Sequence, residues 1–236
     1  MSASCPALSV VIPCFNEEEC LDATLEELLP VLYGMENSWE VIVVDDGSRD
    51  RSVSIARKWA EKEDRVRLEQ HRVNHGSGQA IWTGIQAATG TYVTYVPADG
   101  QFDHAELPRY LEKARAGADI VIGARCDRHD YTPYRLLSSR VFLFLCSSLF
   151  DQDFEDVNWV HLWRRDLFQS VQPRSRGVFF LEEILVRARD LGYTVAETPS
   201  TYRPRAGGVA KGGRPEVILL TLWEMSQLWR ERRARR

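Results

Sequence analysis

The chain has 236 residues, of which 44% are hydrophobic and 27% are charged, and its formal net charge is −4. This length and composition predict one globular domain with a sizeable core. The longest apolar run, at 217–223, is much shorter than the roughly 20 residues of a membrane-spanning helix, and the N-terminus has no secretory pattern. The five cysteines show no CxxC spacing, so we expect a reduced, cytoplasmic compartment.

Short runs rich in β-branched residues predict the strands of a sheet. They lie at 8–12, 39–44, 65–69, 91–96 and 119–125, with two later ones at 156–163 and 193–197. Helical patterns alternate with these strands. One lies at 21–32, a second ends at about residue 62, a third lies around 81–88, and the others lie at 104–116, 135–150, 179–191 and 215–236. This alternation predicts an α/β fold with a doubly wound, mostly parallel sheet. We expect one domain over 1–213, with residues 214–236 as a C-terminal amphipathic helix and basic tail of the same unit.

Two helix starts carry capping residues. Asn16 with Glu19 three residues later has the spacing of a capping box, and Asp103 precedes the helix expected from His104. We therefore expect both side chains to accept hydrogen bonds from helix N–H groups.

Acidic turns follow two of the predicted strands. The run at 39–44 leads into Asp45 and Asp46, and the run at 91–96 leads through Pro97 to Asp99 and Gln101. Ligands of open α/β sheets bind at the carboxyl ends of strands. Asp45 and Asp46 are candidates for a nucleobase or ribose, and Asp99 with Gln101 for a divalent cation on a diphosphate. The alternative is that these carboxylates only shape turns or cap helices.

Glycine-rich and basic segments offer candidate phosphate contacts. The glycines at 76 and 78 would let backbone N–H groups approach phosphate, although an ordinary loop is an equal alternative. Arg203 and Arg205 flank Pro204 beside a glycine-rich loop and favour anion binding. The five histidines show no metal-ligand spacing.

Five segments in order resemble family 2 glycosyltransferases, especially the dolichol-phosphate mannose synthase or polyprenyl-phosphate glycosyltransferase type. They are VIPCFNE at 11–17, VVDDGS at 43–48, NHGSG at 74–78, ADGQ at 98–101 and YRPRAGG at 202–208. The resemblance covers about residues 8–213 and implies a GT-A fold. It implies a nucleotide-diphospho-sugar donor, UDP- or GDP-linked, and Mg²⁺ or Mn²⁺ as cofactor, with no nucleic-acid partner.

The resemblance also implies roles for individual residues in donor binding. The nucleoside would contact Pro13, Phe15, Glu17 and Asp45, with Gly78 at the phosphates. The metal ion and diphosphate would be bound by Asp99 and Gln101. The family usually has Asp-x-Asp here, and Pro97 stands at the first position. Weaker metal dependence, or a relative that binds a nucleotide-sugar or a partner enzyme without catalysis, is therefore the alternative.

A second group of residues is implied on the acceptor side. Arg125, Arg135 and Ser139 match contacts to the acceptor phosphate and donor sugar. Arg205 and Lys211 match the basic loop that closes over the phosphates. Asp156 matches the acid before the family's xxLxRR segment.

The reaction expected from this resemblance is inverting displacement by an acceptor oxygen. A polyprenyl or dolichyl phosphate needs no general base, whereas a hydroxyl acceptor needs one, for which Asp156, Glu182 and Glu183 are the candidates.

The segment at 217–229 is apolar, and residues 230–236 are rich in arginine. Residues 203–236 carry a net charge of +6, so the first 202 residues sum to −10. A helix of this kind could lie on an anionic membrane, so the protein could be peripheral on the cytoplasmic face; packing on the domain is the alternative.

Overall fold

The computed structural model describes residues 6–35, 38–126, 133–204 and 215–235. Its strands are β1 (Leu8–Cys14), β2 (Trp39–Asp45), β3 (Val66–Gln70), β4 (Tyr92–Tyr95), β5 (Ile120–Arg125), β6 (His161–Arg164) and β7 (Val195–Ser200). Its α-helices are α1 (Leu21–Gly34), α2 (Ser52–Lys62), α3 (Ser77–Ala87), α4 (Leu107–Arg115), α5 (Pro133–Phe150), α6 (Phe180–Asp190) and α7 (Pro215–Arg235). Two short 3₁₀ helices, η1 (His104–Glu106) and η2 (Arg165–Gln169), complete the elements.

The seven strands form one sheet in the order β3-β2-β1-β4-β6-β5-β7. Strand β6 is antiparallel to both of its neighbours, and the other described pairings are parallel. The expected doubly wound, mostly parallel sheet is therefore confirmed. The expected strand at 156–163 was placed too early, because residues 156–158 turn toward the site before β6 begins at His161.

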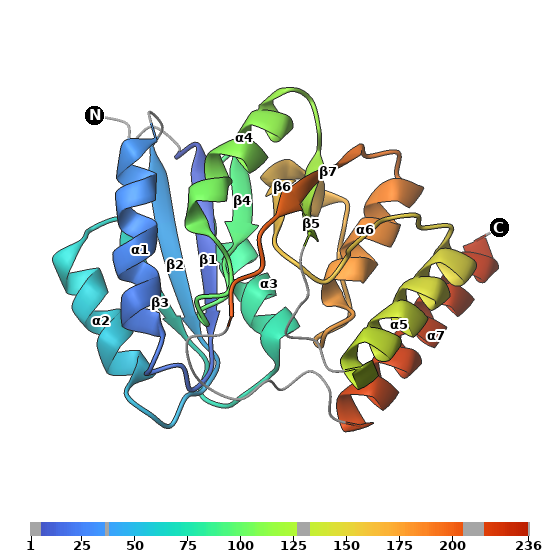
Figure 1. The fold of residues 1–236 in the computed structure, drawn as a ribbon, viewed down its shortest axis with the longest axis horizontal. Coiled ribbons are helices and arrows are strands. Elements are labelled where there is room, and N and C mark those ends of the chain that lie inside the picture. Colours follow the sequence, from blue (N-terminus) through green and yellow to red (C-terminus); the bar gives the residue numbers. More distant parts are fainter. Residues whose placement is uncertain (1–5, 36–37, 127–132, 205–214, 236) are drawn as a thin grey trace.

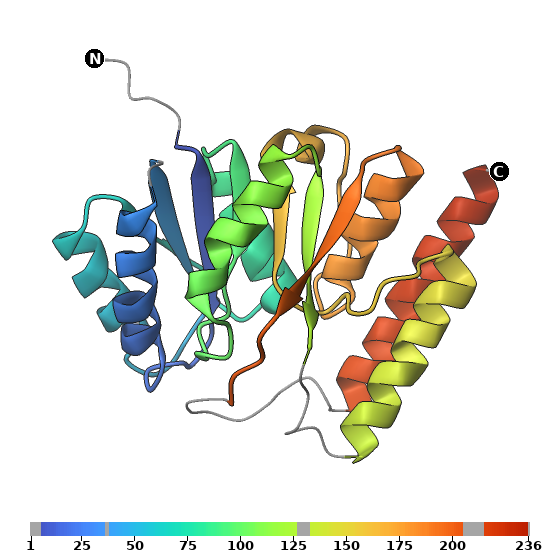
Figure 2. The ribbon, with the colours of Figure 1, turned by 45° about the horizontal axis from the view of Figure 1, so that its top comes forward.

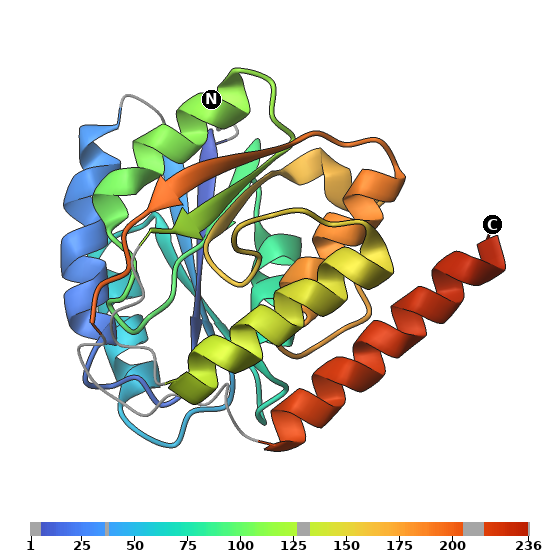
Figure 3. The ribbon, with the colours of Figure 1, turned by 45° about the vertical axis from the view of Figure 1, so that its right-hand side comes forward.

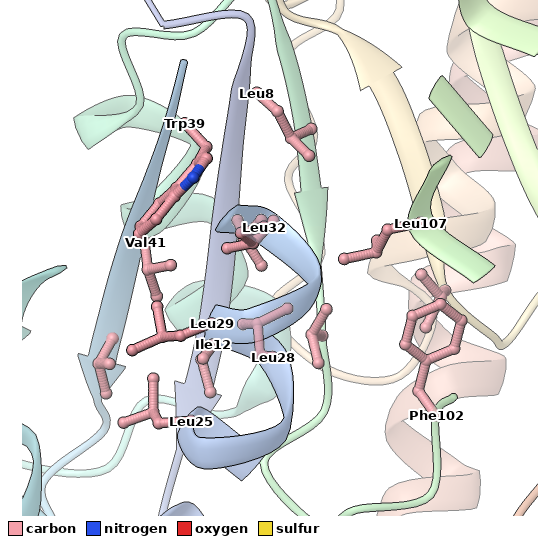
Figure 4. Close-up of a cluster of buried hydrophobic side chains, with 14 of the residues drawn as sticks. Leu8, Ile12, Leu25, Leu28, Leu29, Leu32, Trp39, Val41, Phe102 and Leu107 are labelled. Atoms are coloured by element: carbon pink, nitrogen blue, oxygen red, sulfur yellow. The ribbon is translucent and has the colours of Figure 1, made fainter. Parts of the chain in front are cut away.

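Helices cover both faces of the sheet (Figure 1). One face packs against α1, α2 and α4, where the leucines of α1 meet the side chains of β1 and β2 (Figure 4). The other face packs against α3 and α6. Sheet strands buried on both faces carry continuous apolar runs, as in residues 10–12 and 41–44.

Helices α5 and α7 form a separate pair at the β7 end of the molecule. They lie side by side and point in the same direction (Figures 2 and 3). Cys146 and Phe150 of α5, Met225 and Leu228 of α7, and Val186 of α6 share a third apolar cluster. Within the described residues, no helix is long and apolar enough to cross a bilayer.

Candidate functional site

A cavity of about 590 Å³ opens where β1, β2 and β4 end. Its walls come from residues between 13 and 17, Asp46, the segment 74–78, Tyr95 to Asp99, Asn158, residues between 176 and 181, and two residues of α7. The location at the carboxyl ends of parallel strands is the one expected for a ligand site in this class of sheet.

Asp46 fixes the segment that leads into α3. One of its carboxylate oxygens accepts a hydrogen bond from His75 N at 2.9 Å and lies 2.7 Å from His71 Nδ1. The other accepts from Gly76 N at 2.8 Å, and His71 Nε2 lies 2.9 Å from Thr83 Oγ1. Asp46 thus holds the N-terminal end of α3, whose positive dipole end faces the cavity. The sequence pattern carried no signal for His71.

Asp45 is buried and shapes the turn after β2. Its two carboxylate oxygens accept from Ser48 N at 3.3 and 3.2 Å. Gly47 has φ of +76°, and a Cβ there would lie 2.7 Å from the backbone of Val73. Of the two aspartates, Asp46 and not Asp45 lines the cavity.

The turn after β1 is bound to the turn after β2. Asn16 N donates to Ser48 Oγ at 2.9 Å, and Asn16 Oδ1 accepts from Arg49 N at 2.8 Å. Asn16 has φ of +53°, and α1 begins only at Leu21, so the expected capping box is wrong. Pro13, Phe15 and Glu17 line the cavity. The expected cap by Asp103 is confirmed, because its side chain accepts from Ala105 N.

Asp99 lies in the cavity wall and is 8% exposed. Its Oδ1 accepts from Gln101 N at 3.2 Å, and Gln101 Nε2 donates to the Tyr202 hydroxyl at 2.6 Å. Pro97 also lines the cavity, and the described residues contain no cluster of three His, Cys, Asp or Glu that could hold a metal ion. Gln101 does not line the cavity, so a cation held at Asp99 would take most of its other ligands from phosphate oxygens and water, as Mg²⁺ prefers.

Arg125 and Asp156 are bound to each other. Arg125 Nε lies 2.5 Å from Asp156 Oδ2, and Nη2 lies 2.9 Å from Oδ1, with both side chains less than a tenth exposed. The guanidinium lies over the rings of Trp159 and Tyr202. Neither charged residue lines the cavity, so each neutralises the other beside the site.

The other predicted acceptor-side residues are spread over α5 and the region outside the described residues. Ser139 is half-buried on α5 and does not line the cavity. The side chain of Arg135, and the whole of Arg205 and Lys211, fall outside the described residues. Arg203, expected to bind an anion, instead contacts Glu27 at 3.1 Å and Asp103 at 2.8 Å.

Glu182 and Glu183 begin α6 but face away from the cavity. Burial raises the pKa of Glu182 to about 8, a shift that its contact with the Cys146 thiol reduces, and neither carboxylate oxygen accepts a hydrogen bond of good geometry among the described residues. Glu183 Oε2 accepts from Arg174 N and Ser175 N at 3.0 and 2.6 Å, and its Oε1 accepts from Arg187 Nε. Neither glutamate lines the cavity, so neither is placed to act as a general base.

Residues 9–176, more than half of the chain, match the model for "Glycosyl transferase family 2". The chain belongs to glycosyltransferase family 2. Its sheet with helices on both faces is the GT-A arrangement that the sequence motifs implied.

Curated relatives of this family 2 glycosyltransferase include proteins that act on lipid-linked substrates. An undecaprenyl-phosphate 4-deoxy-4-formamido-L-arabinose transferase of Pectobacterium atrosepticum is 38% identical over 134 residues, 56% of this chain and 41% of that protein. The uncharacterized glycosyltransferase EpsJ of Bacillus subtilis is 31% identical over 181 residues, 70% of this chain and 49% of that protein. The matched region thus spans less than half the length of these relatives.

Solved structures share the fold at lower identity. Glucosyl-3-phosphoglycerate synthase from Mycobacterium tuberculosis, in complex with phosphoglyceric acid, has a TM-score of 0.71 at 20% identity, covering 94% of this chain and 80% of that one. The same enzyme with Mn²⁺, UDP and glucosyl-3-phosphoglycerate has a TM-score of 0.68 at 20% identity, with the same coverage.

Proposed function

We propose that this family 2 glycosyltransferase moves a hexosyl unit from a nucleotide-diphospho-sugar to a polyprenyl phosphate, with inversion at the anomeric carbon. The supporting observation is the composition of the cavity. Motif residues such as Phe15, Asp46 and Asp99 line it together with Val217 and Leu220 of α7. A polar donor end and an apolar flank suit a sugar nucleotide that meets a lipid-linked acceptor.

The donor is proposed to lie across the ends of β1, β2 and β4. Pro13, Phe15 and Glu17 would contact the nucleoside, with Asp45 shaping the turn beneath it, and the diphosphate would approach Gly78 at the N-terminal end of α3. Complexes of the structural neighbour contain UDP or UDP-glucose, which supports a UDP-linked donor, with a GDP-linked donor as the alternative.

Displacement requires stabilisation of the leaving diphosphate. Asp99 and Gln101 would hold Mg²⁺ or Mn²⁺, which supplies positive charge against the phosphate oxygens. The dipole of α3 adds positive potential from the protein itself. Arg205 and Lys211 are proposed to contribute in the same sense from the segment outside the described residues.

The absence of a suitably placed base among the described candidates favours a phosphate acceptor. Asp156 is paired with Arg125, Glu183 binds backbone N–H groups and Arg187, and Glu182 is buried away from the cavity. A phosphate oxygen is already anionic at neutral pH and attacks without losing a proton. A hydroxyl acceptor would need a carboxylate that these contacts do not release.

The α5–α7 surface supports a membrane-bound acceptor. It is defined by eight exposed apolar side chains, of which Phe144 is 69% and Leu219 is 68% exposed. The set is Tyr134, Leu137, Val141, Phe144, Leu219, Leu220, Leu222 and Trp223. Large exposed apolar patches mark interaction sites, and Leu220 makes this one continuous with the cavity. Peripheral binding to the cytoplasmic face of a membrane through this surface is part of the proposal.

Two of the C-terminal arginines make contacts within the protein. Arg232 pairs with Asp190 at 2.7 Å, and Arg233 lies over the ring of Trp229. The apolar face is concentrated instead in the first half of α7 and on α5.

The proposed reaction is tested by incubating the protein with UDP- and GDP-sugars, Mn²⁺ and undecaprenyl phosphate in phosphatidylglycerol vesicles. We expect a glycosyl phospholipid from one donor class and no product when undecaprenol replaces the phosphate. Transfer to the alcohol at an equal rate would contradict the phosphate acceptor. Thermal protection by a nucleotide-sugar that Mn²⁺ does not increase, together with no transfer, would favour the non-catalytic alternative that Pro97 raises.

Membrane binding is tested by flotation with the same vesicles. The double variant Leu137→Ser with Leu219→Ser removes two exposed apolar side chains of the α5–α7 surface and should float much less than the native protein. Leu191→Ser is the matched control, because Leu191 is 56% exposed at the end of α6. Equal flotation of all three proteins would remove this surface from the proposal.

A further inference from the structure

The segment 174–178, between η2 and α6, forms one wall of the donor cavity. Arg176, Gly177 and Val178 line the cavity together with the end of β1 and the start of α3. The segment has no regular secondary structure, so its position depends on contacts made by other elements.

Two buried carboxylates from different helices hold this segment by its backbone. Glu183 of α6 accepts from Arg174 N and Ser175 N. Glu224 of α7 accepts from the next residue, with its Oε1 3.0 Å from Arg176 N. Three consecutive N–H groups are therefore bound by charged acceptors, which are the stronger class of hydrogen bond.

Glu224 is an unusual residue on α7. It is only 7% exposed on a helix whose neighbouring positions Leu222 and Trp223 are 44% and 60% exposed. Burial raises its pKa, so keeping a carboxyl group here works against the preference of a charge for water. Its contact with Arg176 N gives this buried group a specific partner.

The segment is also in direct contact with the start of α3. Arg176 O accepts from Gln79 N at 3.3 Å, and a Cβ on Gly78 would lie only 2.6 Å from that oxygen. Because the two backbones are in contact, a displacement of Arg176 must also shift the first turn of α3. This is the turn proposed above to face the donor diphosphate.

We infer that Glu224 is a positioning residue for the donor site. Through its hydrogen bond with Arg176 N, the position of α7 determines the position of the cavity wall and of the first turn of α3. Glu224 touches neither substrate, and its effect is on the geometry of the donor pocket. The inference rests on the proposed function for its kinetic consequence, whereas its structural consequence stands without it.

The kinetic test compares Glu224→Ala with Glu224→Gln. Alanine removes the acceptor, and glutamine retains an oxygen at the same place. We expect Glu224→Ala to raise KM for the nucleotide-sugar about tenfold, the order expected for one lost hydrogen bond to a charged group, with a smaller change in kcat and in KM for the lipid phosphate. Glu224→Gln should restore most of the native KM.

Arg232→Ala is the matched control for a general loosening of α7. It removes the contacts of Arg232 with Asp190 of α6, at 2.7 and 2.8 Å, and with Leu149 O of α5, without touching the segment 174–178. Its donor KM should equal that of the native protein. A tenfold rise in Arg232→Ala, an unchanged KM in Glu224→Ala, or equal impairment of the Gln and Ala variants would each overturn the assignment.

Hydrogen exchange separates this inference from the proposed function. In Glu224→Ala the amides of 174–178 and 76–80 should exchange faster, with the rest of the sheet unchanged, whether or not any sugar is transferred. If the native protein neither binds nor transfers a nucleotide-sugar, the proposed function fails, and exchange alone decides the role of Glu224. Unchanged exchange at both segments would refute it.

Discussion

Two sets of carboxylates, one on each half of the sheet, are held in different ways. On the β1–β4 side, Asp45, Asp46 and Asp99 accept hydrogen bonds from backbone N–H groups close to strand ends. On the β5–β7 side, Asp156 and Glu231 pair with arginine side chains from other elements. Backbone contacts fix the shape of a turn, whereas side-chain pairs join elements that are distant in sequence. The strand-end turns of the donor pocket are thus held by backbone contacts, whereas Asp156 and Glu231 join separate elements on the β5–β7 side.

The largest difference between these halves should appear when Asp156 is changed. Asp156→Ala removes the carboxylate that is paired with the buried Arg125 guanidinium, which costs about 3–5 kcal/mol of unfolding free energy. Urea denaturation measures this loss. Asp166→Ala is the control, because its pair with Arg164 is exposed and contributes at most about 1 kcal/mol. Equal losses in the two variants would show that the buried pair contributes no more to the unfolding free energy than the exposed pair.

The donor half should respond in activity instead of stability. Asp99→Ala is expected to lower the rate of sugar transfer on the order of a hundredfold to a thousandfold, because it removes the carboxylate proposed to hold the metal ion. Asp103→Asn, four residues further on, keeps the cap of η1 and should retain activity. Initial rates at saturating Mn²⁺, with melting temperatures as a check on folding, make the comparison. Near-native turnover in Asp99→Ala would contradict the metal assignment.

Glu182 is expected to have a smaller effect, which is on the pH dependence of stability. Among the described residues its side chain is bound neither to the backbone nor to an arginine. Its pKa is raised to about 8 by burial, so the native state keeps a proton that the unfolded state loses above its ordinary pKa. Stability therefore falls as pH rises, by at most about 1.4 kcal/mol per unit, until the folded pKa is passed. Burial lowers the pKa of His161 to about 3 and of His104 to about 4, which acts in the opposite direction below pH 6.5.

The window from pH 6.5 to 8 lies above the range of the two histidines and therefore separates Glu182 from them. Urea midpoints measured across it should decline more in the native protein than in Glu182→Gln. The exposed Glu216 supplies the control, since Glu216→Gln should leave the decline intact. A native stability that does not change over this window would show that Glu182 is ionised or solvated.

Local patterns predicted the donor half closely. The apolar spacing of 21–32 placed α1, and the positions of Asp99 and Asp103 after β4 were expected from the sequence. The capping box at Asn16 failed because Ser48 and Arg49, distant in sequence, compete for the same backbone and side-chain groups. A local sequence pattern cannot include hydrogen-bond partners that are distant in the sequence.

Tertiary contacts explain what the sequence left open in the other half. The segment 174–178 has no motif, and its place in the cavity wall follows from Glu183 and Glu224 on two later helices. Asp156 and Arg125 were expected to act separately on substrate, yet they are bound to each other across 31 residues of sequence. The exposure of α5 and α7 likewise depends on which side of each helix packs on α6.

The antiparallel strand β6 has a consequence for folding during synthesis. It lies between β4 and β5, so β5 is made before either of its neighbours in the sheet, β6 and β7. The four-strand unit β3-β2-β1-β4 can assemble while the chain is still emerging from the ribosome. Both edges of β5 stay unpaired until β6 and β7 have been synthesised. A ribosome that pauses before residue 161 would therefore expose the free edge of β4 and an apolar strand, which is a risk for aggregation.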